Sequence, residues 1–148
     1  SVRHCVLVLD VQSGNCLMTV GSQGEGQVQF QCPAGVAFNR RGELFVSDVV
    51  ANRILRFDAS GACMGAVHVE GGPQGLAFLA TGELVVGRIR CSFLMLKEDG
   101  SLLRKIRYHH PPESVAVGED GYVYSCGLGA GYISKSSPFG INCGVIPR

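Results

Sequence analysis

A short motif recurs three times in this chain at an almost constant spacing, and it limits the fold more than any other feature of the sequence. The copies begin at Pro33, Pro73 and Pro112, which lie 40 and then 39 residues apart. A glycine follows each copy at a matching distance; these glycines are Gly42, Gly82 and Gly121. Such a period predicts a series of similar supersecondary units, each of which buries its apolar face against the next.

The unit that begins at Pro33 contains four short apolar runs separated by turn residues. We expect strands at 35–38, 43–48, 53–58 and 62–69, because short apolar runs bounded by glycine, asparagine and aspartate are typical of strands. The 21 glycines of the chain indicate many tight turns and disfavour helices. Four antiparallel strands in about 40 residues are typical of one propeller blade. The sequence therefore predicts an all-β fold, a β-propeller of four-stranded antiparallel blades.

The strand pattern divides the chain into about three blades. We expect a half-blade and its connection at 1–31, full blades at 32–71 and 72–110, a partial blade at 111–135 and an unassigned tail at 136–148. Because closed propellers have roughly four to eight blades, about three blades need completion. Two explanations stay open. Either the chain is part of a longer protein, or two copies form a head-to-tail homodimer in which the half-blade of one completes the partial blade of the other.

Proline, glycine and polar residues mark fixed positions in these units. In the first unit they are Pro33, Gly35, Gly42, Asp48, Asn52, Arg53 and Gly61, and in the later units Pro73, Gly75, Gly82, Gly100, Pro112 and Gly121. This signature resembles the NHL repeat, a unit of β-propellers, and the resemblance covers most of residues 4–135. In the second unit, Gly87 is predicted to take the place of Asp48.

The polar residues of the signature are expected to serve the scaffold. Asp48 and Asn52 flank a tight reversal, where short polar side chains can hydrogen-bond to the turn backbone. Arg53 could reach Asp48 across the hairpin. The Asp/Arg pair is therefore interpreted as structural, with a ligand-site role as the alternative.

Basic and aromatic residues gather on one predicted rim of the propeller. Strands alternate in direction, so the turns between second and third strands emerge on the same rim as the connections between blades. We predict a binding rim for protein or RNA there, formed by Arg53, Arg88, Arg90, Tyr108, His109 and His110. Cations that contact phosphates and rings that stack on bases are the means by which proteins bind single-stranded RNA.

The resemblance implies several functions. NHL propellers of the tripartite-motif family are RNA binders and protein-interaction modules, whereas related lactone hydrolases, strictosidine-synthase-like enzymes and the peptide-amidating lyase use metal ligands around the central channel. The inward strands here offer mainly Val, Ala and Leu, with Glu113 as their carboxylate. We therefore predict a protein-binding scaffold that is not an enzyme, with no catalytic residue, metal site or cofactor. Single-stranded RNA binding is the alternative hypothesis, and a propeller hydrolase or lyase is the third.

The composition bears on the cellular compartment of the protein but does not identify a binding partner. A net charge of +1 gives no overall attraction for nucleic acid or membranes, and no apolar run approaches the roughly 20 residues that span a bilayer. The seven cysteines are an odd number without a Cys-x-x-Cys pair, which favours reduced thiols. We therefore expect an intracellular, cytoplasmic protein without a membrane segment.

Overall fold

The computed structural model describes residues 4–24, 26–90, 92–107, 110–127, 131–139 and 142–146. Across these residues the structure contains strands and turns but no helix, and hence no helix long and apolar enough to cross a membrane. The strands are β1 (Val6–Leu9), β2 (Cys16–Val20), β3 (Ser22–Gln23), β4 (Gln29–Phe30), β5 (Pro33–Phe38), β6 (Leu44–Asp48), β7 (Arg53–Phe57), β8 (Cys63–His68), β9 (Pro73–Phe78), β10 (Leu84–Arg88), β11 (Ser92–Leu96), β12 (Leu102–Arg107), β13 (Ser114–Val117), β14 (Val123–Cys126), β15 (Ile133–Ser136) and β16 (Asn142–Ile146).

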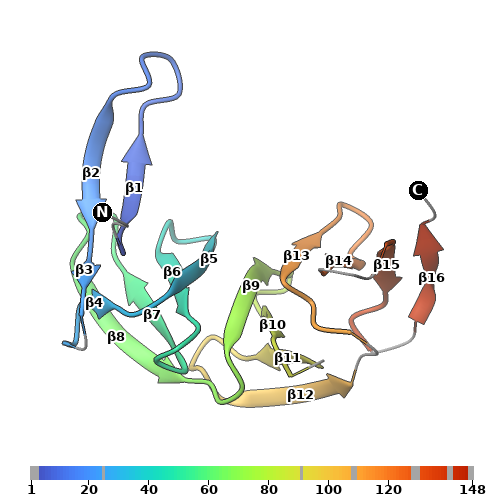
Figure 1. The fold of residues 1–148 in the computed structure, drawn as a ribbon. Helices are drawn as coiled ribbons and strands as arrows, with labels where there is room; N and C mark the ends of the chain where they lie inside the picture. The colour runs from blue at the N-terminus through green and yellow to red at the C-terminus, as the bar shows by residue number, and fades with distance from the viewer. Residues whose placement is uncertain are drawn as a thin grey trace.

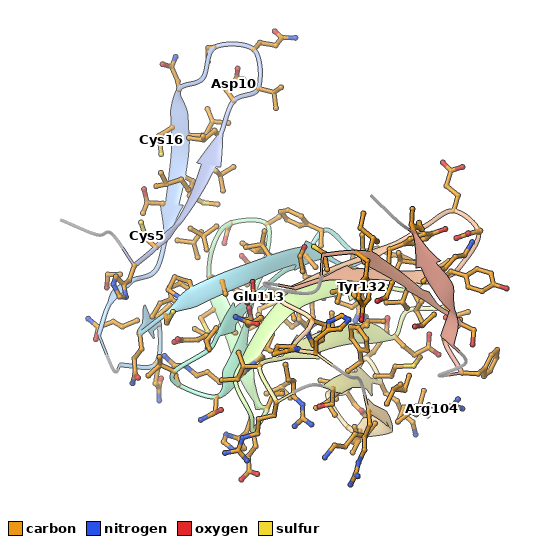
Figure 2. All side chains as sticks on the ribbon, turned by 45° about the vertical axis from the view of Figure 1, so that its right-hand side comes forward. Cys5, Asp10, Cys16, Arg104, Glu113 and Tyr132 are labelled. Atoms are coloured by element: carbon orange, nitrogen blue, oxygen red, sulfur yellow. The ribbon has the colours of Figure 1, made fainter. Side chains whose placement is uncertain are left out.

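Three four-stranded antiparallel sheets form the body of the molecule and confirm the predicted blades. They are β5–β8, which we call blade 1, β9–β12, blade 2, and β13–β16, blade 3, with the strands of each sheet in sequence order. Strand β9 contacts both β5 and β13, so the first strands lie together and the last strands form the outer edges (Figure 1). The hairpin β1–β2 projects away from the blades and carries the labelled Asp10 and Cys16 (Figure 2).

Blade 3 corrects the predicted boundaries at the C-terminal end. Residues 111–135 were expected to form a partial blade, but β16 pairs with β15 and supplies the fourth strand from the tail left unassigned. The hairpin β1–β2 is thus the one half-blade among the described residues. The head-to-tail homodimer stays a prediction. It assumed an incomplete blade at each end of the chain, and this assumption is wrong for blade 3.

The core consists of apolar layers between neighbouring sheets. Side chains alternate along each second strand, so Val85 of β10 faces blade 3 while Leu84 and Val86 face blade 1. In the layer between blades 1 and 2, the rings of Phe45 and Phe78 meet edge to face, with centroids 5.0 Å apart. Each fully buried side chain of this size contributes about 1.5–3 kcal/mol through burial, so the layers hold the blades together.

Close approach of the first strands explains the glycine in the repeated motif. A Cβ atom at Gly35 would lie 2.1 Å from the carbonyl oxygen of Gln74, and one at Gly75 would lie 2.7 Å from the amide nitrogen of Val115. Both distances are far below van der Waals contact, so glycine is required where the next blade packs. The third copy of the motif has Ser114 at this position, and Ser114 is exposed.

Candidate ligand-binding rim

Asp48 anchors the rim of blade 1 as a fully buried carboxylate. It pairs with Arg53 across β6 and β7, with 3.6 Å between Oδ2 and the arginine Nε. It also accepts hydrogen bonds from the backbone amides of Gln31, at 3.1 Å, and Cys32, at 2.8 Å. These contacts compensate the buried charge of Asp48.

Arg53 and Asn52 fasten this end of the blade to neighbouring segments. Arg53 Nη2 donates hydrogen bonds to the carbonyl oxygens of Gly26 and Gln29. Asn52 has a positive φ of 52°, and its Oδ1 accepts from the amides of Gly71, at 3.1 Å, and Gly72, at 3.0 Å. The structure therefore places Arg53, predicted as a rim-binding residue, among internal contacts.

The other predicted rim residues separate into groups. Arg88 and Arg90 lie together at the end of β10, on the same rim as the turn that contains Asn52. His110 packs edge to face against Tyr132 of blade 3, with ring centroids 5.0 Å apart. Tyr108 and His109 lie outside the described residues.

A basic hollow of about 450 Å³ lies on this rim where blade 2 meets the connection from blade 1. Its lining residues are Glu70, Gly71, Arg88, Arg90, Ser92, Lys105 and Arg107. Register explains the cluster, because Arg88 pairs with Ser92 and Ser92 pairs with Arg107, which sets the three in a row across the sheet. Alternation along β12 puts Lys105 on the same face as Arg107.

Arg88 is the fixed element of the basic hollow. Its side chain is only 8% exposed; Nε donates to Ser92 Oγ at 3.0 Å and Nη1 to the carbonyl oxygen of Glu70 at 2.7 Å. Burial and, next, the charge of Arg90 lower the pKa of Arg88, while Glu70 opposes the shift. The guanidinium remains protonated at neutral pH. Glu70 is the acid that lines the hollow, and its side chain is 84% exposed, so the positive charge is largely uncompensated.

The described residues do not fit the metal site that the resemblance implies. Among them, no three His, Cys, Asp or Glu side chains come together in a way that could hold an ion. Glu113 lies toward the middle of the molecule, far from the outer edge marked by Arg104 (Figure 2). We therefore assign no chemical step to a metal within these blades.

Comparison with known proteins confirms the resemblance and corrects one prediction. Residues 30–57 match the sequence model of the NHL repeat. The chain is 36% identical over 69 residues, 44% of its length and 20% of the relative's, to a probable peptidyl-alpha-hydroxyglycine alpha-amidating lyase of Caenorhabditis elegans. The prediction that the protein is not an enzyme is wrong, because this sequence relative is a probable lyase.

Solved structures confirm the propeller fold. The chain superposes on virginiamycin B lyase from Staphylococcus aureus with a TM-score of 0.75 at 13% identity, covering 98% of this chain and 49% of that one. Hydrazine synthase from Kuenenia stuttgartiensis matches with a TM-score of 0.70 at 18% identity, covering 84% of this chain and 38% of that one. At these identities the likeness concerns the fold, and the chain spans less than half the length of either structure.

Proposed function

We propose that these blades, which include an NHL repeat, belong to a propeller lyase that acts on a carboxylate-bearing peptide end, and that the basic hollow binds this end. The observation that carries the proposal is the 36% identity over 69 residues with an amidating lyase. A peptidyl-α-hydroxyglycine ends in a carboxylate. Cleavage of its bond between the amide nitrogen and the hydroxylated carbon, with transfer of the hydroxyl proton to that nitrogen, leaves a peptide amide and glyoxylate.

The residues of this chain would bind and orient the substrate. Arg88 is held in place by Ser92 and the Glu70 carbonyl, and Lys105 and Arg107 are exposed cations beside it. Hydrogen bonds from such cations to a carboxylate are charge-assisted and geometrically specific. The surplus of positive charge would also increase the rate at which an anionic peptide arrives.

A peptide ending in α-hydroxyglycine tests the proposal directly. The protein should convert it to the peptide amide, detected by mass spectrometry, and the paired change Lys105→Ala with Arg107→Ala should raise KM about tenfold or more with little change in kcat, since charged hydrogen bonds contribute about 1.5–3 kcal/mol. The control is Arg104→Ala, which removes an equivalent cation from the opposite face of β12. Failure of the unaltered protein to form amide would contradict the lyase assignment, and an unchanged KM in the double variant would contradict the role of the hollow.

Single-stranded RNA binding is the second candidate, supported by four cations gathered at one rim hollow. Among the described lining residues none is aromatic, so base stacking would depend on residues elsewhere. Binding of a labelled single-stranded RNA that weakens steeply with added salt, and weakens further in the Lys105/Arg107 double variant, would favour this candidate. Binding of a protein partner through the rim also stays a prediction.

A further inference from the structure

A largely apolar groove lies between blades 2 and 3, on the rim opposite the basic hollow. The turn from β9 to β10, the turn from β15 to β16 and the outer strand β12 form its walls, and its volume is about 310 Å³. Its lining residues include Leu79, Glu83, Met95, Leu103, Arg104 and Phe139. We call it the outer groove.

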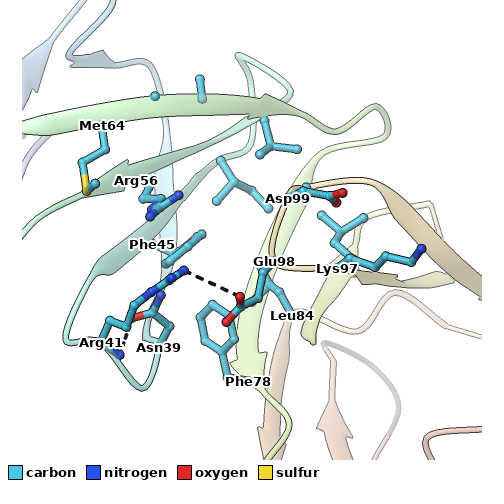
Figure 3. Close-up of a pocket in the computed structure, with 16 residues that line it drawn as sticks. Asn39, Arg41, Phe45, Arg56, Met64, Phe78, Leu84, Lys97, Glu98 and Asp99 are labelled. Carbon is cyan, nitrogen blue, oxygen red and sulfur yellow. Dashed lines mark hydrogen bonds and ion pairs between the residues drawn. The ribbon is translucent and has the colours of Figure 1, made fainter. Parts of the chain in front are cut away.

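The corresponding place between blades 1 and 2 holds a carboxylate that is satisfied within the protein. There Glu43, the residue before β6, accepts a hydrogen bond of 2.6 Å from Arg56 and another from the side-chain amide of Asn39. Figure 3 shows Arg56 and Asn39 next to Phe45, whose ring centre lies 5.9 Å from the guanidinium carbon of Arg56. Blade 1 therefore leaves no charge of this group for a ligand.

Glu83 occupies the same position in blade 2, before β10, but both partners are replaced. Met95 takes the place of Arg56, since each pairs with the second residue of the second strand of its blade. Leu79 takes the place of Asn39, since the backbone amide of each donates to the backbone carbonyl of the glutamate. Two apolar side chains thus stand where blade 1 has a cation and an amide.

The Glu83 carboxylate is consequently available to a ligand. Its Oε2 accepts a hydrogen bond from the hydroxyl of Thr81, whereas its Oε1 has no donor among the described residues and is not buried. No cationic side chain of the described residues lies within 4.0 Å of Glu83. A half-buried carboxylate of this kind favours a ligand that brings a cation, because hydrogen bonds between charged groups are about twice as strong as neutral ones.

Arg104 supplies the opposite charge at the outer end of the groove. Its side chain is exposed at the edge of the molecule (Figure 2), and its guanidinium carbon lies 5.4 Å from the centre of the Phe139 ring. No carboxylate in the described part of the chain lies within 4.0 Å of it. Arg104 pairs with Met95 of β11, and β11 separates β12 from β10. Because neighbouring strands are about 4.8 Å apart, the backbones that carry the two charges are about 10 Å or more apart.

The surface between the two charges is apolar. Leu79 and Met95 are buried and form its floor, while Leu103 of β12 and Phe139 of blade 3 are 46% and 72% exposed and form its outer walls. The volume of the groove lies at the lower end of the roughly 300–1,000 Å³ that small-molecule sites have. The ligand that fits is therefore compact, with an apolar body.

We propose that the outer groove binds a free amino acid with an apolar side chain. Its ammonium group donates to Glu83 Oε1, its carboxylate accepts from Arg104, and its side chain lies against Leu79, Met95 and Leu103. A simple amine leaves Arg104 unmatched and brings a second cation beside it, and a simple carboxylate does the same to Glu83, so a zwitterion matches the groove best. This site is separate from the basic hollow and does not depend on lyase activity.

Titration calorimetry with three related ligands tests the proposal. L-Phenylalanine carries both charges, phenethylamine lacks the carboxylate and 3-phenylpropanoate lacks the ammonium group. We expect saturable 1:1 binding of phenylalanine and about threefold to fivefold weaker binding of either analogue, since partly exposed charge pairs contribute up to about a factor of five. Glu83→Gln should weaken phenylalanine to the same extent without weakening 3-phenylpropanoate. Arg104→Gln should weaken phenylalanine without weakening phenethylamine, and Leu103→Ala should weaken all three ligands.

The matched controls are Glu98→Gln and Arg41→Gln. These residues form an exposed ion pair on the same rim between blades 1 and 2, with 3.7 Å between Oε2 and Nη2 (Figure 3), so their replacement should leave all three affinities unchanged. Absence of saturable phenylalanine binding up to about 10 mM would remove the site. Equal binding of the three ligands, or an unchanged affinity for phenylalanine in the Glu83→Gln or the Arg104→Gln variant, would overturn the assignment of an amino acid. If Glu83→Gln does not fold, as judged by its circular dichroism, Arg104→Gln and the three ligands still decide the outcome.

Discussion

Blades 1 and 2 place opposite charges at the same position of the repeat. Asp48 pairs with the motif proline Pro33, and Arg88 pairs with Pro73, so the two residues correspond in register. Across the next strand, Asp48 faces Arg53 whereas Arg88 faces Ser92. Blade 1 thus buries the Asp48 carboxylate together with an arginine, whereas blade 2 buries the Arg88 cation across from an uncharged serine.

This exchange changes what each blade end can do. The Asp48 carboxylate collects backbone amides and an arginine, which satisfies its charge internally. Arg88 is held by neutral oxygens, so its charge is left for the basic hollow. The comparison teaches that a strand end that holds a paired carboxylate in one repeat can hold an uncompensated cation in the next, where the following turn is also one residue shorter.

Of the changes that test this comparison, removal of the Asp48 carboxylate should reduce the free energy of unfolding most. We expect Asp48→Ala to reduce the free energy of unfolding by about 3–5 kcal/mol, because it leaves Arg53 partly buried without its partner and two backbone amides without an acceptor. Urea unfolding measures the change. Asp58→Ala, at an exposed turn, should cost less than about 2 kcal/mol. A similar loss for the two variants would mean that the buried pair is not what distinguishes blade 1.

A methyl group at the motif glycine Gly35 should cause the next largest loss of stability. Gly35→Ala puts a Cβ against the Gln74 backbone, which cannot retreat as a side chain can, and overpacking of this kind costs about 1–3 kcal/mol or more. Ser114→Ala, at the corresponding exposed position of blade 3, should change the free energy of unfolding by about 0.5 kcal/mol or less. Comparable urea midpoints for the two variants would show that the first strands are not in close contact.

Much of this fold follows from the sequence, because the motif period and the turn glycines both report on strand spacing. β16 was not predicted because it follows a turn at Pro138 and Phe139 and contains Gly144 at a φ of 124°, which interrupts the alternation typical of a strand. The correspondence of Gly87 with Asp48 was wrong by one position. Blades 1 and 2 shift register at the same place, and the 40-residue spacing that joins Pro33 to Pro73 also joins Asp48 to Arg88.

Only some residues of the candidate site could be predicted from the sequence. Arg88 and Arg90 stand next to a turn, so an argument from loops finds them. Lys105 and Arg107 belong to an outer strand, and only their pairing with β11 brings them to the same hollow. A loop-based search misses such residues, whereas the cross-strand register of β10, β11 and β12 would have found them.

Introducing the charge pair of blade 1 into blade 2 tests the comparison, and we expect an effect of intermediate size on the free energy of unfolding. Arg88→Asp alone buries a carboxylate that lacks the cross-strand arginine of blade 1, while Arg88→Asp with Ser92→Arg recreates that pairing. We expect a favourable coupling energy of about 1–3 kcal/mol between the two changes in a double-mutant cycle followed by urea unfolding. Additive effects would mean that the two blade ends are not interchangeable.

The smallest expected effect concerns an exposed carboxylate–cation pair in blade 3, which contrasts with the buried pair of blade 1. Asp120 Oδ2 lies 2.7 Å from Lys135 Nζ and accepts a hydrogen bond from Tyr124, and these contacts lower the pKa of Asp120 to about 2 from 3.8. Since the folded-state pKa lies below the unfolded one, the stabilisation is complete above about pH 4 and disappears as the pH falls through 2. The difference in urea midpoint between the protein and Asp120→Asn should be small at pH 6 and should vanish near pH 2. A difference that stayed constant over this range would assign the effect to the hydrogen bond from Tyr124 rather than to the charge.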